Sequence, residues 1–189
     1  MKNFWFQSDS HWEHAKIIQY VNRPFSSVEE MNEKLIENWN KVVQQYDEVY
    51  MLGDVAFCKY DQIIKIMKRL NGIKHLLLGN HDHHIVNHKK EFEDEKIFNT
   101  MDDYKEVSIN KQKIIMSHYP FRSWNGMHHK NPSWMLHGHC HNSMEPLGKS
   151  VDVGVDSTYI TGKAEYRPFH FDEIKRFMDK QPILKHFEK

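Results

Sequence analysis

Short apolar runs alternate with longer amphipathic segments in the first half of the chain. The runs at residues 4–7, 49–52 and 73–78 have the length and composition of buried strands. Between these runs, apolar residues recur at intervals of three and four, as they do on the buried face of a helix. The order strand, helix, strand, helix, strand predicts an α/β fold.

Two helices are predicted between these strands. The first begins at the capping-box sequence Ser27-Val-Glu-Glu30. Its apolar positions are Val28, Met31, Leu35, Trp39, Val42 and Val43. The second is predicted to be capped by Asp61, to run over residues 63–70 and to end at Asn71-Gly72.

The second half of the chain predicts shorter strands at residues 107–109, 113–116, 134–136 and 151–153. Asn110-Lys111 separates the first two and predicts a hairpin turn. The length of 189 residues suits one hydrophobic core, and no linker-like segment divides the chain. We therefore expect a single domain over residues 1–189.

Composition limits the classes of function. Hydrophobic residues make up 39% of the chain and charged residues 28%, and no apolar run approaches 18 residues, so we expect no membrane span. The first residues lack the continuous apolar stretch of a signal peptide, and two cysteines are too few for a disulfide framework. These features favour the cytoplasm. Basic and acidic residues balance at 26 each, which argues against extended duplex nucleic acid as a partner.

Five short polar clusters carry the candidate chemistry. They are Asp9-Ser-His11, Gly53-Asp54, Gly79-Asn80-His81-Asp82, Ser117-His118 and Gly138-His139-Cys140-His141. Most of them directly follow a predicted strand, so their side chains are expected at strand ends. Carboxylates, imidazoles and amide oxygens all bind divalent cations, and a carboxylate can join two of them. The pattern predicts a two-metal site.

In this order the clusters resemble the motifs of the calcineurin-like metallophosphoesterase superfamily, over residues 9–141. The resemblance implies a four-layer α/β/β/α sandwich, with two mixed sheets flanked by helices and a dinuclear centre at one sheet edge. Residues 151–171 would complete the sheets. By the same resemblance, a first ion would be bound by Asp9, His11, Asp54 and His141. A second ion would be bound by Asp54, Asn80, His118 and His139, with Asp54 between the two.

The chemistry expected of such a site is phosphoester hydrolysis. Two divalent ions about 3.5–4 Å apart can share a hydroxide that attacks phosphorus in line with the leaving oxygen. After Asp9, Asp54 and the hydroxide are counted, about one positive charge remains, which suits a phosphodiester monoanion. A monoester dianion would need a further cation, for which Arg23 and Arg122 are the candidates.

The sequence therefore predicts a phosphodiesterase that acts on a small or nucleotide-like phosphoester. The alternatives are a phosphomonoesterase and a non-catalytic metal-binding scaffold on the same fold. A structural zinc module is disfavoured because the ligands are dispersed and thiolate clusters are absent. Two divalent metal ions are the expected cofactors. Oxygen and nitrogen ligation favours manganese and also admits iron, zinc, nickel and cobalt.

His81 follows a predicted ligand, and the resemblance places it near the leaving oxygen as the catalytic proton donor. The Asp and Arg that follow the Gly-Asp motif in protein phosphatases of this superfamily are replaced by Phe57 and Cys58. The usual carboxylate support of the catalytic histidine is therefore missing, and Asp82 becomes the candidate for orienting His81. The same departure disfavours protein dephosphorylation.

Three other residues have two interpretations each. Trp12 would either narrow the substrate pocket or pack in the core. His14 lies one helical turn after His11 and would either support that ligand or lie on a helix surface. Cys140 is interpreted as a small buried residue rather than a ligand.

Overall fold

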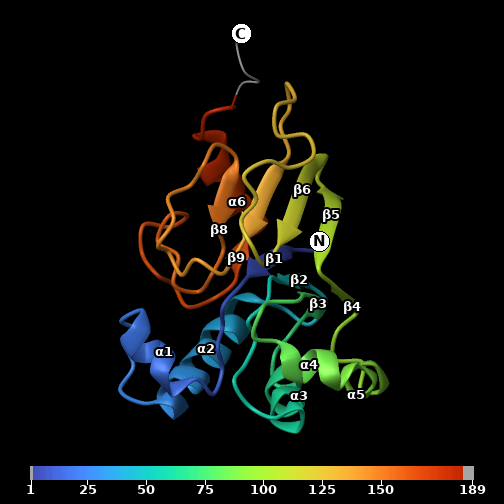
Figure 1. Cartoon of the computed structure of the whole chain (residues 1–189), viewed down its shortest axis with the longest axis vertical. Helices are drawn as coiled ribbons and strands as arrows, with labels where there is room; N and C mark the ends of the chain where they lie inside the picture. Colours follow the sequence, from blue (N-terminus) through green and yellow to red (C-terminus); the bar gives the residue numbers. More distant parts are fainter. Residues whose placement is uncertain (1, 185–189) are drawn as a thin grey trace.

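The computed structural model describes residues 2–184. Within them, a five-stranded sheet has the order β4-β3-β2-β1-β9 (Figure 1). Its strands are β1 (Phe4–Gln7), β2 (Glu48–Met51), β3 (Ile73–Leu77), β4 (Thr100–Asp102) and β9 (Phe169–His170). Strands β1 to β4 run parallel, whereas β9 is antiparallel to β1. The predicted strands at residues 4–7, 49–52 and 73–78 are therefore present to within one residue.

The second sheet has the order β5-β6-β7-β8 and is also mixed. Its strands are β5 (Tyr104–Ile109), β6 (Gln112–Ser117), β7 (Trp134–His137) and β8 (Ser150–Asp152). β5 and β6 form the predicted hairpin, and both residues of its turn, Asn110 and Lys111, have positive φ. That backbone matches the right-handed twist of the flanking strands. β6, β7 and β8 run parallel.

Helices cover the outer face of the first sheet. They are α1 (Ala15–Tyr20), α2 (Val28–Val42), α3 (Tyr60–Lys68), α4 (His83–Asn87) and α5 (Lys89–Asp94). Figure 1 shows these helices gathered at one end of the long axis, with the second sheet and α6 (Phe171–Asp179) toward the other. None of the helices in the described part of the chain is long and apolar enough to cross a bilayer.

Strand alternation divides the core into layers. In β2, Val49 and Met51 pack on the helices, whereas Tyr50 faces the second sheet. The cluster between the sheets also contains buried residues of α6. Outside the second sheet, Trp124 of the segment after β6 packs on Met135 of β7. The fold is thus α/β, with two mixed sheets flanked by helices, as predicted, and the 118–133 segment contributes to the outermost layer.

The helix starts differ in detail from the sequence prediction. Ser27 caps α2 by accepting the N–H of Glu30, whose own carboxylate bonds Ser26 instead of completing the box with Ser27. Asp61 is not the cap of α3, because that helix begins at Tyr60 after Lys59. Asp61 lies instead in the first turn, where a negative charge interacts favourably with the helix dipole.

Candidate metal centre

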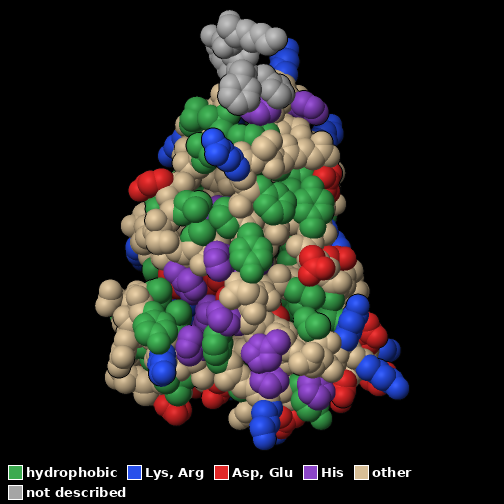
Figure 2. Space-filling view, viewed as in Figure 1, with side chains coloured by type: hydrophobic (Ala, Val, Ile, Leu, Met, Phe, Trp, Pro, Cys, Tyr) green, Lys and Arg blue, Asp and Glu red, His purple; other side chains and the backbone are tan. Residues whose placement is uncertain are grey.

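The predicted ligands lie in loops that follow β1, β2, β3, β6 and β7. The carboxyl ends of parallel strands meet at one edge of a sheet, which is where ligands bind in open α/β folds. The two sheets are joined at this edge, because Ser8 N donates to Val153 O and Ser8 O accepts from Val155 N. Figure 2 shows histidine side chains gathered on this face between the second sheet and the helices.

The side chains predicted for the first ion converge. Asp9 Oδ1 lies 3.9 Å from His11 Nε2 and 3.7 Å from His141 Nε2, and Asp54 Oδ2 lies 3.6 Å from His11 Nε2. These separations are too long for hydrogen bonds. They suit ligand atoms that face a common cation at about 2.0–2.2 Å.

Unpaired buried atoms provide a test of whether a metal fits. Asp9 Oδ1 and His11 Nε2 are buried and have no hydrogen-bond partner among residues 2–184. Leaving such groups unpaired costs roughly 1–3 kcal/mol each, and a coordinated cation would satisfy both atoms. The donor set of carboxylate oxygens and imidazole nitrogens therefore fits a divalent ion.

The side chains predicted for the second ion adjoin the first group through Asp54. The same oxygen, Asp54 Oδ2, lies 3.5 Å from His118 Nε2. Asn80 Oδ1 is 3.0 Å from that nitrogen, so the two predicted ligands converge. The His139 ring packs edge-on against His118, with centroids 5.1 Å apart, and its side chain is exposed. Asp9, Asp54 and His118 also form a group of atoms close enough to hold an ion.

Backbone bonds fix the two carboxylates. Asp9 Oδ2 accepts the N–H of His139 at 2.9 Å, and Asp54 Oδ1 accepts the N–H of His81 at 2.9 Å. Loops that follow different strands thereby hold each other's ligands.

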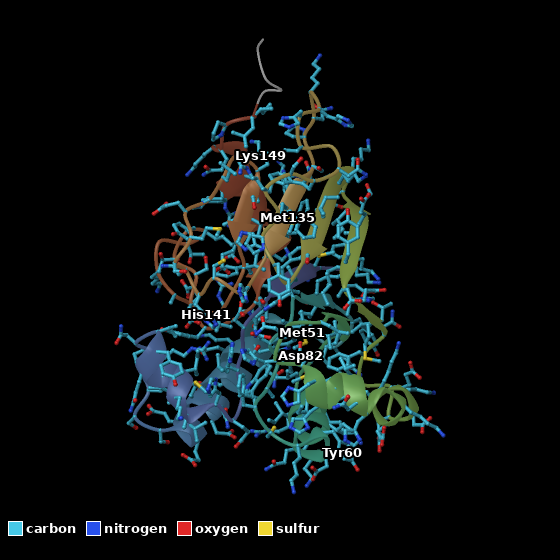
Figure 3. All side chains as sticks on the ribbon, in the orientation of Figure 1. Met51, Tyr60, Asp82, Met135, His141 and Lys149 are labelled. Carbon is cyan, nitrogen blue, oxygen red and sulfur yellow. The ribbon has the colours of Figure 1, made fainter. Side chains whose placement is uncertain are left out.

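Asp82 has a different role from the one predicted. Its buried carboxylate accepts the N–H groups of Asp54, Val55 and Gly79, so it holds the loops after β2 and β3 together. It therefore does not orient the His81 ring. Asp82 is labelled in Figure 3.

Aromatic packing surrounds His81 in place of the missing carboxylate. The Phe57 ring lies 4.7 Å from that of His81 and 5.1 Å from that of His11. His14 stacks on Phe57 at 3.8 Å, and its Nδ1 is 3.1 Å from His11 Nδ1. His14 therefore contacts a predicted ligand, whereas Trp12 is fully buried in the core beside the helices.

The two candidate substrate arginines lie in different environments. The Arg23 side chain is fully buried and forms two 2.8 Å bonds to Asp156. It also donates to the backbone oxygens of Asp9 and Ser10. This burial does not fit the prediction that Arg23 receives a substrate phosphate. Arg122 is exposed and lines a pocket beside the loops after β6 and β7.

Known proteins resemble the chain over nearly its whole length. The uncharacterized protein MJ1445 of Methanocaldococcus jannaschii is 31% identical over 194 residues, which cover 98% of this chain and 96% of the relative. The chain belongs to the MJ1445 family. No protein-family model matches it. The gene 66 protein of Mycobacterium phage L5 is 26% identical, in a match that covers 83% of this chain and 88% of the phage protein.

A solved structure shares the fold of this MJ1445 family member. It is the protein of unknown function AQ665 from Aquifex aeolicus, at 24% identity and a TM-score of 0.69. The match covers 93% of this chain and 99% of that chain.

Burial shifts the pKa values at the centre of this MJ1445 family member. It raises the pKa of Asp9 well above its ordinary value and lowers the pKa of His11 and His118. Burial also acts to lower the pKa of His141, but the hydrogen bond to Asp156 and the charge of Asp9 outweigh it and raise that pKa. Burial therefore disfavours the ionised form of Asp9 in the metal-free site. A bound cation would stabilise that ionised form.

Sequence reasoning missed a buried carboxylate that contacts a predicted ligand. Asp156 Oδ2 accepts a 2.8 Å bond from His141 Nδ1. It lies four residues after β8, outside the five polar clusters. Its position after a strand end is the sequence signal that could have drawn attention to it.

Proposed function

We propose that this protein is a dinuclear-metal-dependent phosphoesterase that hydrolyses a small, nucleotide-like phosphodiester. The observation that carries the proposal is the pair of buried, unpaired atoms, Asp9 Oδ1 and His11 Nε2, beside the carboxylate of Asp54. The order of motifs, which resembles the metallophosphoesterase superfamily, supplies the reaction class. Phosphoester hydrolysis accounts for both features.

In this proposal, Asp9, His11, Asp54 and His141 hold one ion, and Asp54, Asn80, His118 and His139 hold the other. When bound, the ions would provide a nucleophile at neutral pH and stabilise negative charge on the phosphoryl group. The loops keep the two half-sites adjacent, because one oxygen of Asp54 lies 3.6 Å from His11 and 3.5 Å from His118. We propose manganese as the metal, since the ligands are oxygen and nitrogen atoms.

His81 is proposed to donate a proton to the leaving oxygen. Its backbone N–H bonds Asp54, and its half-buried ring lies 5.9 Å from that of His11, centroid to centroid. Phe57 packs against the ring and limits its orientations. A histidine held beside the reacting phosphoryl group can assist departure of a basic alkoxide.

The preference for a diester follows from charge. Arg23 is committed to Asp156 and to backbone oxygens, so it does not offset the second negative charge of a monoester. An open cleft of about 600 Å³ is lined by Phe57, Lys59 and Lys65, and also by Glu13 and Asp61, so its charges balance. Its aromatic wall suits the organic part of a nucleotide-like substrate.

The test is hydrolysis of bis-p-nitrophenyl phosphate and p-nitrophenyl phosphate by the metal-free full-length protein, with and without Mn²⁺. We expect Mn²⁺-dependent hydrolysis with a higher kcat/KM on the diester. Asp54→Asn should abolish it, whereas the matched exposed variant Asp179→Asn should retain it. Turnover of monoesters alone would overturn the diester preference, and binding of Mn²⁺ without turnover of either ester would favour the non-catalytic scaffold.

A further inference from the structure

The Asp156 carboxylate joins three separate segments of the chain at the candidate metal centre. It lies after β8, in the segment whose Gly154 pairs with Ser8. Its Oδ2 is 2.8 Å from His141 Nδ1, and its two oxygens are each 2.8 Å from a nitrogen of Arg23. In Figure 3, His141 lies where the second sheet meets the helical end of the molecule.

Arg23 continues this contact to the loop that carries Asp9. Its Nη2 donates to Asp9 O at 2.7 Å, and its Nη1 donates to Ser10 O at 2.8 Å. The Arg23 side chain is fully buried, and that of Asp156 is 6% exposed. The loop after β1 and the loop after β7 are therefore tied through one buried ion pair.

We propose that Asp156 is a positioning residue for the first ion, and that with Arg23 it makes the Asp9, His11, Asp54 and His141 half-site the tighter of the two. The proposal rests on the dinuclear centre of the proposed function. A carboxylate that accepts from Nδ1 of a histidine fixes the ring, leaves Nε2 as the ligand and strengthens its donation to a metal. His141 Nε2 accordingly faces Asp9 Oδ1 at 3.7 Å.

The second half-site has weaker support of this kind. His118 Nδ1 bonds the neutral backbone oxygen of Leu52 at 2.8 Å. The ring nitrogens of the exposed His139 have no hydrogen-bond partner within residues 2–184. In the proposed assignment the first half-site has the carboxylates of Asp9 and Asp54, and the second has Asp54 as its assigned carboxylate with Asp9 nearby. The assigned charge and the fixed orientation of His141 therefore favour occupancy of the first half-site.

The competing explanation is that Asp156 only neutralises Arg23. Asp156→Asn alone would leave the Arg23 charge buried with a weakened partner, which is destabilising. The double variant Arg23→Met with Asp156→Asn removes both charges, so it restores a foldable core without restoring the carboxylate at His141. Glu173→Gln is the matched control, because Glu173 of α6 forms a similar two-bond pair with Arg167, which lies before β9.

In the experiment, the metal-free full-length proteins are titrated with Mn²⁺. Calorimetry measures the number of bound ions and their affinities, and electron paramagnetic resonance detects spin-coupled pairs. For the wild type we expect two ions and a spin-coupled pair. Asp156→Asn should bind one ion about 10- to 100-fold more weakly and the other within about twofold, with fewer coupled pairs. The double variant should show the same loss while unfolding cooperatively, and Glu173→Gln should bind as the wild type does.

Two results overturn the inference. One is wild-type affinity for both ions in folded Asp156→Asn. The other is recovery of wild-type affinity in the double variant, which would mean that only the stranded Arg23 charge mattered. If the wild type binds two ions and Asp156→Asn binds both with the same affinity, this inference is refuted but the proposed function is not. A wild type that binds no Mn²⁺ refutes the proposed function as well.

Discussion

Strained backbone is concentrated at the predicted ligands. Within the described part of the chain, five of the seven have positive φ: Asp9, His11, Asp54, His139 and His141. Such conformations cost non-glycine residues about 1–3 kcal/mol each, so they persist only where neighbouring contacts enforce them. The three N–H bonds to Asp82 and the bond from His139 N to Asp9 are contacts of this kind. Each ligand's direction thus depends on residues from other loops.

His81→Ala tests the role of one side chain at this scale. We expect unchanged Mn²⁺ content, because His81 contributes its backbone N–H and not its ring to Asp54. Diesters with basic alkoxide leaving groups should slow by about 100-fold or more, and p-nitrophenyl esters much less. The measurement is kcat/KM for both ester classes on the same metal-loaded protein. Equal slowing of both classes would exclude a proton-donor role.

Lys74 gives a pH-dependent prediction far from the polar clusters. Burial lowers its pKa from 10.5 to about 8, and its Nζ donates to Leu70 O and Gly72 O. Between pH 8 and 10.5 the unfolded chain holds this proton and the folded chain does not, so the contribution to stability rises with pH. It amounts to at most about 3 kcal/mol.

The measurement is urea unfolding from pH 7.5 to 10.5 of the wild type and Lys74→Met, which keeps the apolar stem. The difference in unfolding free energy between the two proteins should grow with pH in favour of the wild type. A constant difference across this range would show that the lysine has an ordinary pKa in the fold.

Glycines allow the loops after β2 and β3 to lie in contact. A Cβ at Gly79 would overlap both the backbone nitrogen and the carboxylate of Asp54. Gly53 has φ +89° and lies against Gly79 from the other loop. The close approach brings the Asp54 carboxylate near His118, which in turn contacts Asn80. The loops after β2 and β3 can therefore place Asp54 correctly only if Gly53 and Gly79 are both glycine.

Gly79→Ala should displace Asp54 and abolish binding of at least one Mn²⁺, with a loss of stability on the order of 1–3 kcal/mol. Gly162→Ala is the control, because nothing lies within 4 Å of its added Cβ although its φ is +84°. The Gly162→Ala control should lose about 1 kcal/mol of unfolding free energy and should bind Mn²⁺ as the wild type does. Calorimetric Mn²⁺ titration and thermal unfolding measure both effects. Full metal binding by Gly79→Ala would contradict the importance of this contact.

At the scale of the whole molecule, the candidate metal centre lies where the two sheets and their loops meet. Burial raises the pKa of Asp9, so its contribution to the stability of the metal-free protein is complete below the unfolded value of 3.8. That contribution is lost as the pH rises through the raised folded value. A bound cation would remove this loss by stabilising the ionised carboxylate.

Mn²⁺ should therefore raise the unfolding temperature more at pH 7.5 than at pH 5, where protons compete with the metal for Asp9 and for His141, whose pKa values are both raised. At a hundredfold excess over Kd, one ion contributes about 2.7 kcal/mol. Differential scanning calorimetry with Mn²⁺ and with a chelator measures the shift. The Asp54→Asn protein serves as the control and should show a much smaller shift. An equal shift at both pH values would exclude titration of Asp9 as the cause.

Local sequence determined much of the fold. The spacing of apolar residues was sufficient to predict β1, β2, β3 and the core of α2, because burial on one or both faces imposes that spacing. Strand β4 and helices α1, α4, α5 and α6 were not predicted, and all of these except α6 are six residues or shorter. Strand β9 lies within residues 151–171, which were expected to complete the sheets. Asp61 fits a cap in sequence, but the fold begins α3 one residue earlier, at Tyr60.

The sequence by itself determined which residue types are available at the strand ends, and hence the seven candidate ligands and the reaction class that they suggest. Tertiary structure decided which atoms face one another. It placed Arg23 on Asp156 rather than on a substrate, turned Asp82 toward backbone N–H groups, and put Phe57 beside His81. The physical reason is that strand periodicity is a local property, whereas burial and hydrogen-bond pairing between residues up to 133 positions apart depend on how the loops pack.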